Sequence, residues 1–349
     1  MLFDLNPDYK NNYAIQANLG IQRQITNSIS VEIAYQMYHG LHIQQPVGLN
    51  YCEAGTPGCP ATNATQAAAL LTRNTRVLGP LYRVCSTGVA NQTDTQCGRV
   101  NDAGITQFTD YQSRGSSIYH GVTFQLTKRF SNYFSFQTNY TFSKAIDDQT
   151  DFNSAFAPPF PSRLTTERSL STFDVRNNFV FSGVFTSPFK SGAGHNFASR
   201  ALADITLSPS VFIRSGIPFT IRTGADINGD TRSGTDRLFY IGRNTGIGPD
   251  FRSVNMRLSK MFRFGAESSK RIEFSVDGGN LFNRTNFGSV NELVPTAFDA
   301  AGNPTAIDYL SDTVRLRGRR DRDFRRGEPL SFTTAFAPRQ LLLGLKFAF

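Results

Sequence analysis

Large apolar residues recur at every second position in nine stretches of the chain, and polar residues occupy the positions between them. A period of two places the apolar residues on one face of a β-strand and the polar residues on the other. The pattern therefore predicts an all-β chain. The stretches are 12–25, 29–37, 116–130, 134–146, 179–187, 205–213, 254–258, 272–276 and 338–349. Pro209 lies inside the sixth stretch, where a central strand normally rejects proline, so we expect a local bulge there.

The last stretch shows the alternation most clearly. Its large apolar residues are separated by a thinner and partly charged set, and the chain stops on an aromatic residue. An amphipathic C-terminal strand of this kind resembles the closing strand of bacterial outer-membrane β-barrels. The resemblance implies that Phe347 and Phe349 belong to a signal that the barrel-assembly machinery reads. The final strand of a water-soluble barrel is the alternative.

The connections between the predicted strands alternate between short and long. Outer-membrane barrels have short periplasmic turns and long extracellular loops, whereas a soluble sandwich has no reason to gather its long loops at one end. We therefore expect one domain over 1–349, an antiparallel transmembrane β-barrel in the bacterial outer membrane with lipid covering its apolar face. The short connections are 26–28, 131–132, 188–200 and 265–269, and the long ones are 43–115, 147–172, 223–250 and 284–337.

Composition excludes a helical membrane protein but agrees with a barrel. Apolar residues make up 39% of the chain, and no stretch approaches the roughly 20 uncharged apolar residues that a membrane helix needs. A barrel strand turns half of its residues toward a polar lumen, which dilutes the apolar signal. Aromatic residues near strand ends fit an interfacial girdle. They are Phe130, Tyr133, Phe134, Phe264 and Phe349.

Two features predict that these residues are the C-terminal part of a larger barrel. The first residues show no basic region followed by an apolar run, as a signal peptide would. Nine strands is an odd number, whereas bacterial barrels normally have an even one. An open sheet in lipid would also leave an edge of unpaired backbone groups, each costing several kcal/mol.

Four segments carry a more specific resemblance. They are FDVRNNFVFSG at 173–183, RSGIPFTI at 214–221, DINGDTRSGTDR at 226–237 and GNLFNRTNFG at 279–288. In this order they resemble motifs in the barrels of TonB-dependent receptors, above all the Oar-like group, which carries a carboxypeptidase-regulatory-like domain at its N-terminus. The resemblance covers most of the chain.

The family likeness implies a barrel of about 22 strands with a plug domain. Such a receptor imports a large ligand across the outer membrane with energy delivered through the TonB system, which contacts the N-terminal part. Plug and TonB-contacting segment have no counterpart in these residues. A passive porin, or a structural or adhesive outer-membrane protein, is the alternative. The sequence does not identify the ligand.

The four cysteines, Cys52, Cys59, Cys85 and Cys97, lie in the predicted extracellular loop 43–115. An even number of cysteines outside the cell favours disulfides within each near pair. Zinc is the alternative, although neither pair has CxxC spacing.

Asp226, Asn228, Asp230 and Asp236 form a DxNxD run followed by a later carboxylate, which resembles a loop for a hard cation such as calcium. The run lacks the glycine and glutamate that an EF-hand places at its sixth and twelfth positions, so a solvated turn is the alternative. We expect no other cofactor.

A strongly basic run lies in the predicted extracellular loop 284–337, and much of the net charge of +9 rests on it. In a cytosolic chain it would indicate nucleic acid. In an extracellular loop we expect it to meet lipopolysaccharide phosphates or an anionic ligand, or to be solvated, and we expect no nucleic-acid partner. Its arginines are Arg315, Arg317, Arg319, Arg320, Arg322, Arg325 and Arg326.

No motif in the chain predicts catalysis. HExxH, GxSxG and a phosphate-binding glycine loop are all missing from the sequence, and the four histidines are scattered. We therefore expect a transport or receptor barrel and not an enzyme.

Overall fold

The computed structural model describes most of the strands and parts of the loops. No helix in this described part of the chain is long and apolar enough to cross a membrane. The described residues are 2–48, 83–84, 98–99, 108–149, 158–159, 161–189, 196–222, 234–237, 242–264, 270–293, 296–298, 304–306 and 332–348.

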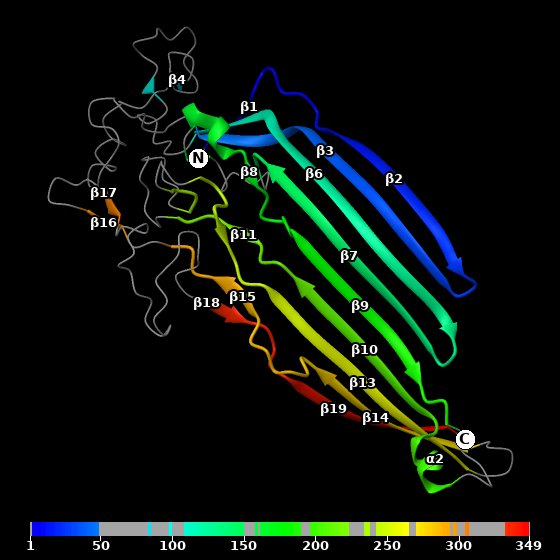
Figure 1. The fold of residues 1–349 in the computed structure, drawn as a ribbon. Helices are drawn as coiled ribbons and strands as arrows, with labels where there is room; N and C mark the ends of the chain where they lie inside the picture. Colours follow the sequence, from blue (N-terminus) through cyan, green and yellow to red (C-terminus); the bar gives the residue numbers. More distant parts are fainter. Residues whose placement is uncertain are drawn as a thin grey trace.

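Long antiparallel strands form a single curved sheet, in which each strand lies beside its neighbour in sequence (Figure 1). This confirms the predicted antiparallel β-architecture. Among the described residues, β2 and β19 are the two edges, and the sheet does not close between them. In order, the strands are β2 (Tyr13–Thr26), β3 (Ile29–Gly48), β6 (Phe108–Ser131), β7 (Phe134–Asp147), β9 (Asn177–Thr186), β10 (Ile205–Arg214), β13 (Phe251–Phe264), β14 (Lys270–Gly279) and β19 (Gln340–Ala348).

Shorter elements decorate the ends of the long strands. Two join the main sheet: β1 (Leu2–Leu5) runs parallel to β6, and β8 (Ser169–Leu170) pairs with β7. Four further pairs are β4 (Arg83–Val84) with β5 (Gly98–Arg99), β11 (Pro218–Phe219) with β12 (Gly246–Ile247), β15 (Phe287–Val290) with β18 (Phe332–Ala335), and β16 (Thr296–Phe298) with β17 (Pro304–Ala306). The helices among the described residues are the 3-10 helix η2 (Pro161–Glu167) and the α-helix α2 (Phe197–Leu202).

Register places the apolar residues of successive strands on one face of the sheet. One row crosses five strands as Ile33, Phe124, Tyr140, Phe179 and Ile213, each directly opposite the next. Because side chains alternate along a strand, the residues between these positions form the opposite face. That face is polar, and its rows include Thr123 opposite Thr141 and Thr141 opposite Asn178.

None of the described elements forms a second layer over the apolar face (Figure 1). Ile21, Phe124 and Leu343 are 71%, 46% and 68% exposed, although each lies well inside a strand. In the described part of the chain, buried hydrophobic residues are confined to Val47, Ala203, Phe219 and Ile221. A soluble sheet could not leave so much apolar surface uncovered.

Pro209 does not cause the bulge that we expected. The register of β10 with β13 is unbroken, with Pro209 opposite Met256, and the β10–β9 register is the same before and after it. Ser208 and Pro209 are left out of the paired positions between β10 and β9. The hydrogen bond that proline cannot donate is therefore lost only on the β9 side. The same register places Gly183 opposite Pro209, and glycine has no side chain to crowd the proline ring.

Lys128 fastens the turn between β6 and β7 from the apolar face. Its Nζ donates to the carbonyl of Ser131 at 2.9 Å and to that of Phe134 at 3.2 Å, and it lies 3.9 Å from the centre of the Phe134 ring. Lys128 is buried, so its ammonium group makes these contacts away from water.

Replacing Lys128 with methionine should therefore lower the free energy of unfolding by about 1–3 kcal/mol, because the turn carbonyls lose a charged donor. The urea midpoint of the membrane-inserted chain measures this. Lys270→Met is the matched control, since Lys270 lies on the same face near the same end but is exposed. Equal midpoints for the two variants would contradict the capping role.

Candidate functional site

Three long connections fold together at one end of the sheet. They link β7 to β9, β10 to β13 and β14 to β19, and residues from all three enclose a cavity of about 380 Å³. We call the described parts of these connections the loop cap. Asp147, the last residue of β7 and a member of the polar face, is bound from the cap by Arg243. The cap therefore lies at the long-loop end, on the polar side of the sheet.

A buried ion pair joins two of these connections. Arg237 Nη2 lies 2.5 Å from Glu167 Oε1, and the two side chains are only 3% and 4% exposed. Glu167 is the last residue of η2, and Arg237 ends the 226–237 segment. A buried pair of opposite charges holds its two elements together strongly, because separating them would leave a charge without compensation in a region of low dielectric.

Arg243 adds a second link from the same connection. Its guanidinium donates to both the backbone carbonyl and the carboxylate of Asp147, and its Nε donates to the carbonyl of Glu167 at 2.8 Å. One arginine thus binds the end of β7 and the end of η2 together. The formal charges within each of these two pairs cancel.

Arg222 links the second connection to the third. Its guanidinium binds Glu292 and donates to the carbonyl of Gly234, while its backbone N–H donates to the carbonyl of Glu292 at 2.8 Å. Burial lowers the pKa of Arg222, but a guanidinium remains protonated in any physiological range. About a third of each side chain of this pair remains exposed, so a ligand can reach it.

The apolar wall of the cavity comes from the 214–221 segment. Phe219 and Ile221 are buried, and β11 pairs with β12 so closely that a Cβ on Gly246 would lie 2.4 Å from the Phe219 ring. A Cβ on Gly216 would lie 1.8 Å from the carbonyl oxygen of Gly248. These glycines therefore permit a close crossing of two backbones, which larger residues would separate.

Polar side chains complete the lining. Asn244 donates to the carbonyl of Leu170 at 2.6 Å and accepts from the hydroxyl of Thr220 at 2.7 Å. The hydroxyl of Thr235, by contrast, is buried and finds no hydrogen-bond partner among the described residues. A buried hydroxyl at the cavity wall is a group that a polar ligand can satisfy.

The 279–288 segment anchors the third connection through asparagine side chains. Asn286 makes a reciprocal pair with the backbone of Arg252, donating at 2.8 Å and accepting at 2.9 Å. Asn280 and Asn283 have positive φ angles of 47° and 51°, a conformation that asparagine tolerates better than most residues. Asp174 of the 173–183 segment plays a similar part, accepting from the N–H of Ala145 at 2.6 Å. These motif residues thus bind the loops of the cap to the ends of the strands.

Most of the site residues proposed from the sequence lie outside the described residues. This holds for the four cysteines, the seven arginines, Phe349, and for Asp226, Asn228 and Asp230, so disulfides, anion contacts and calcium stay predictions. Asp236 is described and is fully buried in the cap beside Arg237. Phe347 lies on the apolar face opposite Ile272. No metal-binding group of three or more candidate ligands is found in the part of the chain that was described.

The residues that tie the cap together were missed by sequence reasoning. Glu167 and Arg237 are 70 residues apart, and Asp147 and Arg243 are 96 apart, so no local pattern connects them. The only signal was indirect, since Arg237 closes one of the four family-like segments.

A one-layer antiparallel sheet with an uncovered apolar face, a polar face and long loops at one end defines a β-barrel protein of the outer membrane. The family model described as an outer membrane beta barrel domain matches residues 1–242. The chain belongs to this family, and its location is the bacterial outer membrane. No curated protein sequence matches it significantly.

Several solved outer-membrane transporters and receptors are similar in structure. The transporter YddB from Escherichia coli shares 10% identity at a TM-score of 0.45, over 80% of this chain and 30% of that one. The ferripyoverdine receptor of Pseudomonas aeruginosa gives 10% and 0.41, over 97% and 27%. BauA, the ferric preacinetobactin receptor of Acinetobacter baumannii, gives 11% and 0.40, over 96% and 29%. The chain thus spans less than a third of these proteins.

Proposed function

We propose that this chain forms part of the barrel of a TonB-dependent receptor of the Oar-like group. Such a receptor takes up a large ligand across the outer membrane. The role is transport without catalysis. The four family-like segments support this proposal, because 214–221 and 226–237 supply residues that line the cavity. The segments 173–183 and 279–288 bind the neighbouring strand ends through Asp174 and Asn286. Coupling to the TonB system would act through a plug domain beyond these residues.

The loop cap is the observation that carries the proposal. Three loops from separate parts of the chain are tied by ion pairs over the polar side of the sheet, and they enclose a cavity with apolar, hydroxyl and charged lining. A ligand arriving from outside would meet this end first, because long loops of outer-membrane barrels are extracellular. We propose that the cap makes the first contact with the ligand.

Further partners are proposed from the sequence. The arginine run within 315–326 would contact lipopolysaccharide phosphates or an anionic ligand. Phe347 and Phe349 would be read by the barrel-assembly machinery during insertion, and bound calcium at 226–236 would brace the segment that ends in Arg237.

The gene and a conductance measurement together test the transport proposal. Coding sequence upstream of Met1 should contain a plug domain and a TonB-contacting segment. The complete gene product, reconstituted in a planar bilayer in potassium chloride, should then show no steady ionic current, because a plug closes the lumen. A signal peptide followed directly by a few strands, with a steady current, would identify a passive porin and overturn the proposal.

A further inference from the structure

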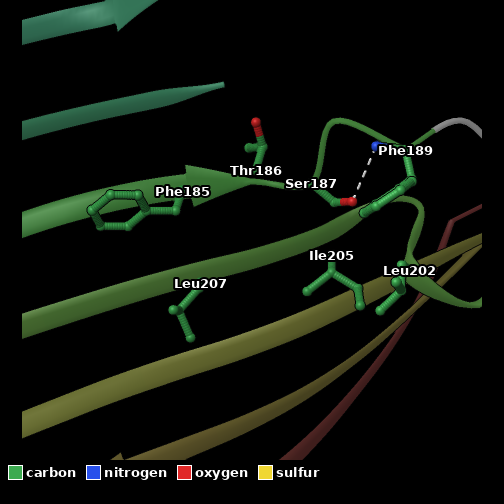
Figure 2. A pocket seen from close by; sticks show the side chains of 7 residues that line it. All are labelled: Phe185, Thr186, Ser187, Phe189, Leu202, Ile205 and Leu207. Atoms are coloured by element: carbon green, nitrogen blue, oxygen red, sulfur yellow. Dashed lines mark hydrogen bonds between the residues drawn. The ribbon is translucent and has the colours of Figure 1, made fainter. Parts of the chain in front are cut away.

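A second cavity lies at the opposite end of the sheet, beside the only connection at that end that contains a described helix (Figure 2). Its volume is about 250 Å³, and it lies between the end of β9, the helix α2 and the start of β10. We call it the α2 groove. Figure 2 shows Phe185, Phe189, Leu202 and Ile205 gathered around it. This is the short-turn end, which is periplasmic in an outer-membrane barrel.

The groove is continuous with the apolar face of the sheet. Phe185 stands opposite Phe134 and Leu207 in the sheet, and both belong to that face. Ile205 stands opposite Lys260 in the same set of rows. Since lipid covers this face in an outer-membrane barrel, the groove opens onto the bilayer.

Polar groups around the groove already satisfy one another. The N–H of Phe189 donates to Ser187 Oγ at 3.2 Å (Figure 2), the N–H of Ser187 donates to the carbonyl of Ile205 at 2.8 Å, and the N–H of Thr186 donates to the carbonyl of Tyr133 at 2.7 Å. A ligand in the groove therefore finds apolar surface and bound backbone. Hydrocarbon suits such a surface, while a polar ligand would lose its hydration without compensation.

The backbone groups at both ends of the helix α2 have hydrogen-bond partners, whereas its apolar side chains are exposed. Asn196 Oδ1 accepts from the N–H of Ser199 at 2.8 Å, and Lys260 Nζ donates to the carbonyls of Arg200 and Ala201, each at 3.0 Å, and to that of Ala203. Capped ends are what a helix needs at the edge of a bilayer, where water is scarce.

The apolar residues of α2, by contrast, have little protein to pack against. Phe197 is 87% exposed and Leu202 is 46% exposed, and no residue of the helix is buried. In water this exposure would be costly, but at a membrane interface an aromatic ring and a leucine side chain are favourably placed.

Basic residues are spread along the same end of the sheet, and one of them, Arg263, is paired with Asp204 at 3.2 Å. Phospholipid headgroups carry phosphate, and cations near the membrane surface attract anionic headgroups. The basic residues are Arg23, Arg129, Arg200, Arg263, Lys270 and Arg271.

We propose that the α2 groove binds an acyl chain of a phospholipid in the periplasmic leaflet, with Phe197 of α2 inserted at the headgroup boundary. Lys260 acts as a positioning residue, because it holds α2 against the strand that carries it. The site needs only the outer-membrane location, so it stands or falls independently of ligand uptake.

Retained phospholipid tests the site. The full chain is produced in outer membranes, extracted in a mild detergent, washed, and its phospholipid counted by mass spectrometry. Leu202→Asn should lose most of the retained phospholipid. Leu258→Asn should retain it, because Leu258 lies on the same apolar face outside the groove. Equal retention by the two variants would overturn the proposal.

A crosslinking measurement keeps the proposal testable if Leu202→Asn fails to assemble. Phe197 is replaced with p-benzoylphenylalanine in the otherwise unchanged chain, and cells are irradiated. Adducts with the mass of a phospholipid support the site. Adducts with protein alone, with lipopolysaccharide alone, or no adduct above that of the same replacement at Asn139 on the polar face, contradict it.

Discussion

Replacing Phe124 with arginine should destabilise the membrane-inserted sheet by about 2–4 kcal/mol, because a guanidinium near the bilayer midplane on the lipid face must be dehydrated. Phe124 is well inside β6, stands between Ile33 and Tyr140 in the apolar row, and is 46% exposed. Nothing in the described structure covers it, so in a membrane its neighbour is an acyl chain.

Gln125→Arg is the matched control, since it introduces the same charge one residue further on. Gln125 belongs to the polar face, where it stands opposite Asn139 and Glu32. An arginine there meets water and polar groups, so its effect should be small. Guanidinium unfolding of the inserted chain, with the folded fraction in outer membranes as a second readout, measures both. Equal losses for the two variants would mean that lipid does not cover the Phe124 side.

The strands were predictable because the two faces of the sheet meet different environments, which produces a period of two in the sequence. Where one face meets lipid and the other a polar lumen, each position is selected for its side, and Phe134 to Phe142 alternate clearly for that reason. Beyond the bilayer both faces meet similar surroundings, so the alternation ends although the strand continues. β3 therefore extends to Gly48 and β6 begins at Phe108, in residues that had been assigned to the loop 43–115.

The error at Pro209 has a different origin. A general rule about proline in strands takes no account of which neighbouring strand loses the hydrogen bond or what stands across from the ring. Gly183 across the ladder could not be paired with Pro209 before the register was known. The helix α2 was missed for a related reason, since six residues are too few to show a helical period, and only Asn196 before Phe197 marks its start.

The loop cap lay beyond prediction because long-range ion pairs leave no trace in local spacing. Single charges such as Glu167 and Arg243 look like ordinary solvated residues until the fold brings them together. The family-like segments indicated a resemblance, but they did not show that their asparagine, aspartate and glycine residues serve to shape loops. The structural roles of Arg237 and Asp174 are therefore recognisable only once their partners are known.

Replacing Arg237 with methionine should destabilise the cap by about 3–5 kcal/mol, because it leaves the Glu167 carboxylate buried without its partner. Local opening of η2 and β8 reports this directly, so hydrogen exchange of residues 161–170 in the inserted chain is the measurement. The strands themselves should keep their exchange protection, because the pair lies outside the sheet.

Two further variants distinguish the effect of breaking the buried ion pair from the effect of removing any positive charge. Arg252→Met breaks an exposed pair with Asp250, whose side chains are 52% and 46% exposed, and such a pair contributes only about 0–1 kcal/mol. Glu167→Gln combined with Arg237→Met should recover much of the loss, since residue 167 then carries no buried charge that has lost its partner. If residues 161–170 exchange no faster in Arg237→Met than in Arg252→Met, the ion pair does not hold the cap together. The shape of the cavity would then depend on the crossing of β11 and β12 at Gly246.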